Sequence, residues 1–209
     1  MMFKKIAVSL AAAIVAFSSN VALAQDDFDT GADARANISP IKAAEFSKQI
    51  ERDLAAKGAR VAVVFRSGMD REKLPKGIRY THGAFWVYQA LVNEDGEEFN
   101  GYAVYNLYNS TEKPQESYLE QDFPINFALP MKVEEVGVIV PTPEIQRRIL
   151  AVMASSSYSA LHEPAYSLIS NPHDARYQNC NEFMLDVISA GIWETDDRAQ
   201  LKANLGAAF

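Results

Sequence analysis

The sequence contains a single cysteine, Cys180, so no disulfide can form within one chain. Basic residues are also scarce, with 20 Lys and Arg against 27 Asp and Glu. This balance argues against nucleic acid as a partner, because affinity for nucleic acid comes mainly from lysine and arginine at phosphates. The sequence has no glycine-rich phosphate loop and no paired metal-ligand motif, so we expect no metal and no cofactor.

Long apolar runs are restricted to the N-terminus. Lys4 and Lys5 precede a mostly apolar run over residues 6–17, and residues 22–24 form a small-x-small cleavage site. We predict that residues 1–24 are a signal peptide cleaved after Ala24 and that the protein is periplasmic. No later segment approaches the roughly 20 apolar residues of a membrane helix, so we expect no integral membrane segment in the mature chain. Loss of the two lysines changes the formal charge from −7 to −9.

The remaining length suits one domain. Residues 25–38 are predicted to be a flexible leader, because the segment is largely acidic, small and polar. Residues 39–209 are predicted to form a single α+β domain, whose oligomeric state the sequence leaves open. Ser39 and Pro40 are typical of a helix start, and apolar residues recur at helical spacing until Gly58.

β-Strand patterns dominate the next part of the chain. Residues 61–65 predict a buried strand, and residues 80–92 and 101–108 flank a turn at 93–96, which predicts a β-hairpin. Residues 136–140 predict a further strand, and Thr142 with Pro143 predicts a helix through about Met153. Residues 155–178 contain two prolines and no sustained period, so we expect a loop, which could gate a site.

Cys180 lies where a helix should begin. Asn179 can cap the helix and Glu182 follows three residues later, which is the spacing of a capping box. In the first helical turn the free backbone amides and the helix dipole stabilise a thiolate, so we expect a lowered thiol pKa. Phe183 and Met184 also allow the cysteine to be an inert part of the core. Both interpretations stay open from these local features.

A thiol nucleophile requires a base, and the chain has three histidines: His82, His162 and His173. His82 opens an apolar strand before two small residues, so a rigid scaffold could fix its ring beside the thiol. His173 is the rival base, ranked second because it lies in a loop. Asn106 of the hairpin is the first choice to orient His82, and Asn109 is the alternative.

Four segments resemble a known bacterial family, domain of unknown function 2145. They are FRSGMD at 65–70, IRYTHG at 78–83, YNLYN at 105–109 and YQNCNE at 177–182. The order of His82 before Cys180 also resembles the circularly permuted branch of the papain-like superfamily, which includes NlpC-type peptidases and lecithin retinol acyltransferase. The resemblance implies an α+β fold in which an antiparallel sheet packs against the cysteine helix, with Cys180 and His82 meeting at the edge of the sheet.

These observations lead to two hypotheses. In the first, the protein is an exported thiol hydrolase or acyltransferase that acts on an amide or ester of a cell-envelope peptide or acyl substrate, with Cys180, His82 and Asn106 as catalytic residues. The backbone amide of Cys180 would bind the oxyanion, with weaker support from Tyr80, Gln178 and Asn179. In the second, the protein is an inactive envelope binding or structural module with a buried cysteine.

Overall fold

The structure is a computed structural model that describes residues 36–93 and 95–209. The predicted signal peptide and most of the predicted leader lie outside the described residues. Helix α1 (Pro40–Ala56) begins where the Ser39 hydroxyl accepts the N–H of Lys42 at 3.3 Å. It ends before Gly58, which has a φ of +64°. Ahead of the helix, the Asn37 N–H donates to the Leu129 carbonyl at 2.8 Å, so the last residues of the predicted leader are anchored to the domain.

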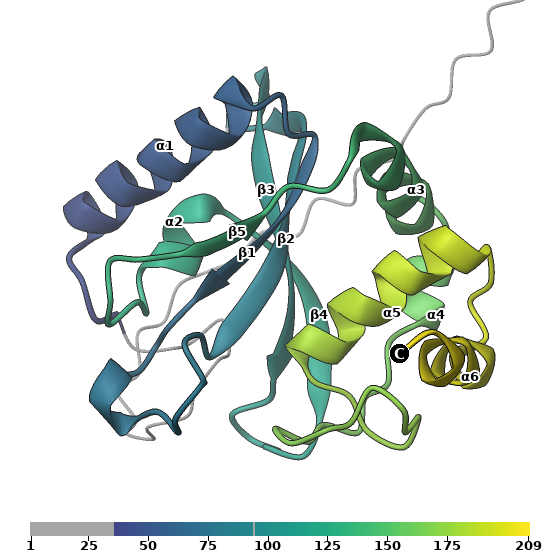
Figure 1. Ribbon diagram of the computed structural model, residues 1–209. Coiled ribbons are helices and arrows are strands. Elements are labelled where there is room, and N and C mark those ends of the chain that lie inside the picture. The colour runs from purple at the N-terminus through teal and green to yellow at the C-terminus, as the bar shows by residue number, and fades with distance from the viewer. Residues whose placement is uncertain (1–35, 94) are drawn as a thin grey trace, which may run out of the picture.

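Within residues 36–93 and 95–209, five strands form one antiparallel sheet in the order β4-β3-β2-β1-β5 (Figure 1). The two longest, β2 (His82–Val92) and β3 (Glu98–Asn109), form the hairpin, whose turn contains Gly96 at a φ of +81°. The flanking strands are β1 (Val61–Arg66), β4 (Ser117–Asp122) and β5 (Gly137–Ile139).

Helices cover both faces of the sheet (Figure 1). One face packs against α1 and the short α2 (Pro124–Ala128). The other packs against α5 (Cys180–Trp193), with α3 (Pro143–Met153), α4 (Ser157–Ala160) and α6 (Arg198–Ala208) around it. A one-turn 3₁₀ helix, η1 (Arg71–Lys73), lies in the connection from β1 to β2.

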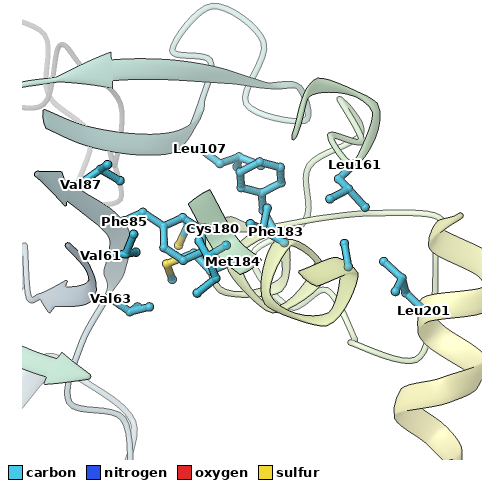
Figure 2. Packing of buried hydrophobic residues seen from close by; sticks show 13 residues of the cluster. Val61, Val63, Phe85, Val87, Leu107, Leu161, Cys180, Phe183, Met184 and Leu201 are labelled. Carbon is cyan, nitrogen blue, oxygen red and sulfur yellow. The ribbon is translucent and has the colours of Figure 1, made fainter. Parts of the chain in front are cut away.

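Side-chain alternation divides the strand residues between these two layers. Even-numbered residues of β2, such as Ala84 and Trp86, face α1 and α2. Odd-numbered residues, such as Phe85 and Val87, pack against α5 in a core that includes Cys180 (Figure 2). Adjacent residues of a strand therefore direct their side chains into opposite layers, and this also holds at the strand ends.

The predicted α+β class is confirmed, as are the N-terminal helix, the hairpin, the strand near residue 138 and the helices at 143 and 180. Circular permutation remains a prediction. The segment predicted as a loop at 155–178 contains α4 and two isolated β-bridges. The strand β4 and the helices α2 and α6 had no matching prediction from the sequence.

Candidate active site

Cys180 is the first residue of α5, as the capping pattern predicted. The Asn179 side chain accepts the N–H of Glu182 at 3.0 Å, and its amide nitrogen donates to the Leu168 carbonyl at 3.2 Å. Glu182 does not return the second bond of a capping box. Its carboxylate instead contacts Lys202 at 2.8 Å and the Ser170 hydroxyl. The Asn179 side chain thus fixes both the start of α5 and the loop that precedes it.

The strands β2 and β3 leave an opening beyond the end of their ladder, and the sulfur of Cys180 lies beside Gly83 at this end of β2. The pairing of these strands begins at Phe85 and Tyr105, so it leaves out His82, Gly83 and Ala84. The Tyr88 N–H donates toward β1, and N–H groups alternate along an antiparallel strand, so Gly83 directs its N–H toward β3. There the Gly83 N–H donates to the Cys180 sulfur.

Gly83 is also required by the packing around this opening. A Cβ added there would lie 2.6 Å from Cε of Met184 and 2.7 Å from the ring of Phe65. Met184 follows Cys180 by one helical turn, so the glycine lets α5 approach β2 closely (Figure 2). The absence of a side chain at Gly83 therefore allows its N–H to reach the thiol.

His82 precedes Gly83 and is 1 % exposed. Its Nε2 lies 2.9 Å from Oδ1 of Asn106. A carbonyl oxygen only accepts, so Nε2 carries the proton and Nδ1 of the neutral ring is the basic nitrogen. Nδ1 is buried and has no hydrogen-bond partner among the described residues. The ring stacks on Tyr108, with centroids 5.1 Å apart, and packs against Phe127 of α2.

His82 and Cys180 reach the end of β2 from opposite layers. His82 contacts Tyr108 and Phe127 on the α2 side, whereas Cys180 belongs to the core beneath α5. The thiol is linked to the imidazole through the intervening backbone at Gly83. The structure thus brings His82 and Asn106 into direct contact and places Cys180 beside the residue that follows His82, without a thiol–imidazole hydrogen bond.

Arg66 completes this cluster, although no role was predicted for it from the sequence. It pairs in register with His82 at the end of β1 and is 1 % exposed. Its guanidinium lies 5.3 Å over the ring of Phe127 and interacts electrostatically with Cys180 and Tyr108. Its Nε and Nη2 have no hydrogen-bond partner among the described residues. Its place in the FRSGMD segment was the available signal.

Burial sets the protonation states. It raises the pKa of the Cys180 thiol, although three backbone N–H groups and Arg66 act to lower it. The expected lowering of the thiol pKa is therefore wrong, because desolvation outweighs the helix N-terminus in this closed arrangement. Burial and the charge of Arg66 lower the pKa of His82 to about 3. The resting site holds a neutral thiol and a neutral imidazole.

The other predicted residues have different surroundings. His173 is exposed, and its Nδ1 lies near Gly206 of α6. His162 lies 3.0 Å from the Ser117 hydroxyl, and Asn109 pairs in register with Ser117 at the end of β3. The Tyr80 hydroxyl donates to Glu135 at 3.3 Å.

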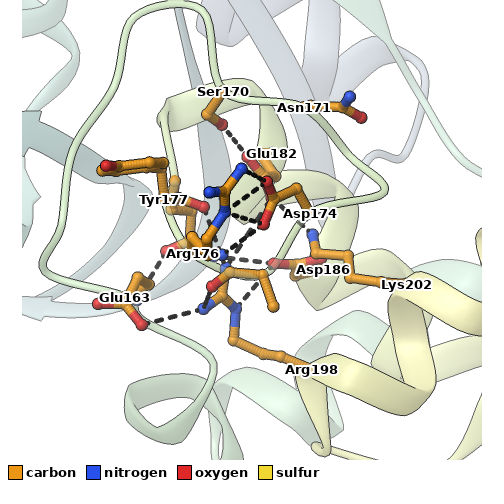
Figure 3. A network of polar contacts seen from close by, with 12 residues as sticks. Glu163, Ser170, Asn171, Asp174, Arg176, Tyr177, Glu182, Asp186, Arg198 and Lys202 are labelled. Carbon is orange, nitrogen blue, oxygen red and sulfur yellow. Dashed lines mark hydrogen bonds and ion pairs between the residues drawn. The ribbon is translucent and has the colours of Figure 1, made fainter.

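The side-chain amide of Gln178 forms hydrogen bonds with residues near the start of α5. It donates to the Leu161 carbonyl at 3.0 Å and to Asp186 at 2.9 Å. Asp186 and Glu182 of α5 in turn contact Lys202 of α6, at 2.6 and 2.8 Å (Figure 3). These nearly buried charges tie α5, α6 and the preceding loop together.

A cavity of about 450 Å³ lies elsewhere, between α3 and the C-terminal end of α5. Arg148, Gly191 and Glu194 are among its lining residues, and the candidate catalytic residues are not. Across residues 36–93 and 95–209, no helix combines the length and apolar character needed to cross a membrane.

A profile of the family described as "Uncharacterized protein conserved in bacteria (DUF2145)" matches residues 53–208. The match includes Arg66, His82, Asn106 and Cys180. Searches among curated proteins and solved structures gave no match. The family-level resemblance found in the sequence is thus confirmed, whereas the resemblance to NlpC-type and acyltransferase enzymes stays a prediction. The chain belongs to the uncharacterized bacterial family DUF2145.

Proposed function

We propose that the protein is a thiol-dependent hydrolase or acyltransferase in which Cys180 is the nucleophile. One observation carries the proposal: the Gly83 N–H that binds the sulfur belongs to the residue after His82. Asn106 holds the imidazole in the tautomer whose Nδ1 is a free base. A nucleophile, a base and a group that orients the base are the components of acyl transfer by a thiol.

The reaction begins when the Cys180 sulfur attacks an amide or ester carbonyl. As the carbon–sulfur bond forms, the thiol proton passes to Nδ1 of His82 and the carbonyl electron pair moves onto oxygen. This transfer requires a rearrangement, because the imidazole and the thiol reach the end of β2 from opposite layers in the resting site. The backbone N–H of Cys180 is the donor proposed for this oxyanion. His82 then gives its proton to the leaving amine or alcohol. Water or an amine, deprotonated by His82, releases the acyl group and restores the thiol.

The resting site must open before this chemistry, because Cys180 is only 6 % exposed. The proposed gate is the segment at 155–178. Its Leu168 carbonyl is held by the Asn179 cap, while Leu168 and Ile169 are exposed to solvent. Movement of this segment would alter the surroundings of the first turn of α5. Hydration of the opening would also reverse the effect of burial on the thiol pKa.

The proposed substrates are peptides or acyl compounds of the cell envelope. This part of the proposal depends on the predicted export signal and on the resemblance to the permuted papain-like branch. The family match covers the site residues but supplies no activity. An experiment on the proposed function must therefore include both a peptide substrate and an acyl substrate.

Acyl-enzyme formation tests the proposal. The native protein is mixed with a small activated ester and with a matched peptide thioester, and adducts are detected by intact mass. We expect an adduct on the wild type, none on Cys180→Ser and much slower formation on His82→Gln. Exposed His173→Gln is the matched control and should react as the wild type. Equal acylation of wild type and His82→Gln would contradict the assigned base.

A binding or structural module is the second candidate, favoured by the burial of both Cys180 and His82. In that case the thiol would react only through global unfolding. Alkylation rates that follow the unfolding equilibrium across urea concentrations would support the module. Alkylation that is independent of low urea concentrations would support a local opening of the site instead.

A further inference from the structure

Residues 168–177 form the tip of the segment that precedes α5, and the apolar core does not hold this tip segment in place. None of its residues is buried, and Leu168 and Ile169 are exposed to solvent. The chain on either side is fixed by backbone pairing, since Gln178 donates its N–H to the Ala165 carbonyl at 2.9 Å. A segment with few buried apolar contacts opens at a low free energy. Polar contacts must therefore decide how often the tip segment opens.

Arg198 of α6 holds the C-terminal end of the tip segment. Its guanidinium donates to the carbonyl of Ala175 at 2.9 Å and to the carbonyl of Tyr177 at 3.3 Å. The same group contacts Glu163 at 3.2 Å and Asp186 of α5 at 3.3 Å (Figure 3). The Arg198 side chain is only 12 % exposed, so these hydrogen bonds are partly shielded from water. One side chain of α6 thus joins the tip segment to α5.

The N-terminal end of the tip segment is held from the turn of α5 that contains Cys180. Asn179 donates from its side-chain amide to the Leu168 carbonyl at 3.2 Å, and the Ser170 hydroxyl donates to the carboxylate of Glu182. The residues that flank the cysteine therefore bond to the tip segment. Its release changes the surroundings of the thiol.

We propose that Arg198 holds the tip segment closed and that release of this contact exposes Cys180 to substrate. The inference rests on the proposed function and deepens it, because it names the residue that controls access to the thiol. Arg198 is a positioning residue, since it acts through the tip segment and touches no reacting atom. Only hydrogen bonds change in this step: the two carbonyls exchange the guanidinium for water.

Opening leaves the buried cation paired. Glu163 and Asp186 lie outside the tip segment, so Arg198 keeps both ion pairs when Ala175 and Tyr177 move away. The freed carbonyls become exposed and bind water instead. The closed state is thus stabilised by a few hydrogen bonds to a charged donor, each of modest net value, and an open population exists without global unfolding.

The experiment measures iodoacetamide alkylation of Cys180 by intact mass, without urea and at several low urea concentrations. Arg198→Met removes the donors at similar length. Arg176→Met is the matched control, because Arg176 pairs with Asp174 inside the tip segment. We expect Arg198→Met to alkylate at least about tenfold faster without urea, at a rate that stays independent of low urea concentrations. Arg176→Met should react as the wild type.

Hydrogen exchange followed by mass spectrometry gives a readout that a general loss of stability would not give. Peptides from the tip segment should exchange faster in Arg198→Met, by a larger factor than peptides from β2, which report global unfolding. Arg198→Lys covers the case in which Arg198→Met does not fold. It keeps the charge beside Asp186, but one ammonium cannot replace the planar fork at both carbonyls, so alkylation should be at least about threefold faster than in the wild type.

Equal alkylation in the wild type and both Arg198 variants would overturn the inference while leaving acyl-enzyme formation on Cys180 intact. An increase that follows the globally unfolded fraction across urea concentrations would also overturn it, because Arg198 would then stabilise the whole fold. Faster alkylation and faster exchange of the tip segment, in a protein that forms no acyl-enzyme, would support the control of access and remove the proposed function.

Discussion

Protonation of His82 should make the protein sensitive to acid. The folded pKa is about 3, against 6.5 for an unperturbed histidine. Between these values the unfolded chain binds a proton that the folded protein excludes, so the free energy of unfolding falls as the pH falls. The contribution of His82 is complete above pH 6.5 and is lost progressively down to pH 3.

The size of this effect follows from the two pKa values. Each pKa unit corresponds to about 1.4 kcal/mol, so the full difference is about 5 kcal/mol and the part between pH 7 and pH 4 is about 3 kcal/mol. A domain has a total stability of about 5–15 kcal/mol, so the loss should be easy to measure. His82→Gln removes the titrating group and keeps a donor for Asn106.

Urea unfolding at several pH values between 7 and 4 provides the assay. The wild type should lose about 3 kcal/mol more than His82→Gln over this interval, because the other titrating groups contribute equally to both. His173→Gln is the control for loss of an exposed histidine and should retain the wild-type slope. Parallel slopes in wild type and His82→Gln would refute the neutral, buried imidazole.

Three further substitutions test the packing around the site, each by urea unfolding. Gly83→Ala should cost about 1–3 kcal/mol, because the added Cβ would overlap the side chains of Met184 and Phe65. Gly101→Ala should cost less, because its added Cβ would lie 3.2 Å from Cδ1 of Leu91. Equal costs would contradict the close approach of α5 to Gly83. Lys202→Met should cost about 1–3 kcal/mol, because the buried carboxylate of Asp186 loses its nearest cation but keeps Arg198 at 3.3 Å. A neutral result would mean that Arg198 compensates fully for the lost lysine. Asn179→Ala should cost about 1 kcal/mol through the lost cap, and an unchanged midpoint would show that the cap is redundant.

Local signals explain why much of the fold was predictable. Ser39 with Pro40, Thr142 with Pro143, and Asn179 mark helix starts through side-chain caps that act within three residues. The hairpin followed from its turn and its apolar strands. In contrast, β4 (Ser117–Asp122) has a mixed composition and gains its structure from pairing with β3, which no local pattern records.

The sequence predicted some of the contacts around Cys180 but not the electrostatics of the candidate site. His82 and Asn106 are in contact, as expected from their places on the two strands of the hairpin. The helix N-terminus at Cys180 predicted a lowered thiol pKa, but burial beneath the sheet opening reverses the sign. No role was predicted for Arg66, because strand pairing, rather than sequence spacing, brings it beside His82. The ion pair of Glu182 was not predicted, because its partner Lys202 comes from α6, a distant part of the chain.

The urea dependence of iodoacetamide alkylation at Cys180 tests its role as the nucleophile most directly, since the chain has one cysteine. The native protein should alkylate at a rate independent of low urea concentrations, through a local opening, and His82→Gln should slow that reaction. Alkylation that occurs only in proportion to the globally unfolded fraction, with no effect of His82→Gln beyond stability, would make Cys180 a core residue and contradict its role as a nucleophile.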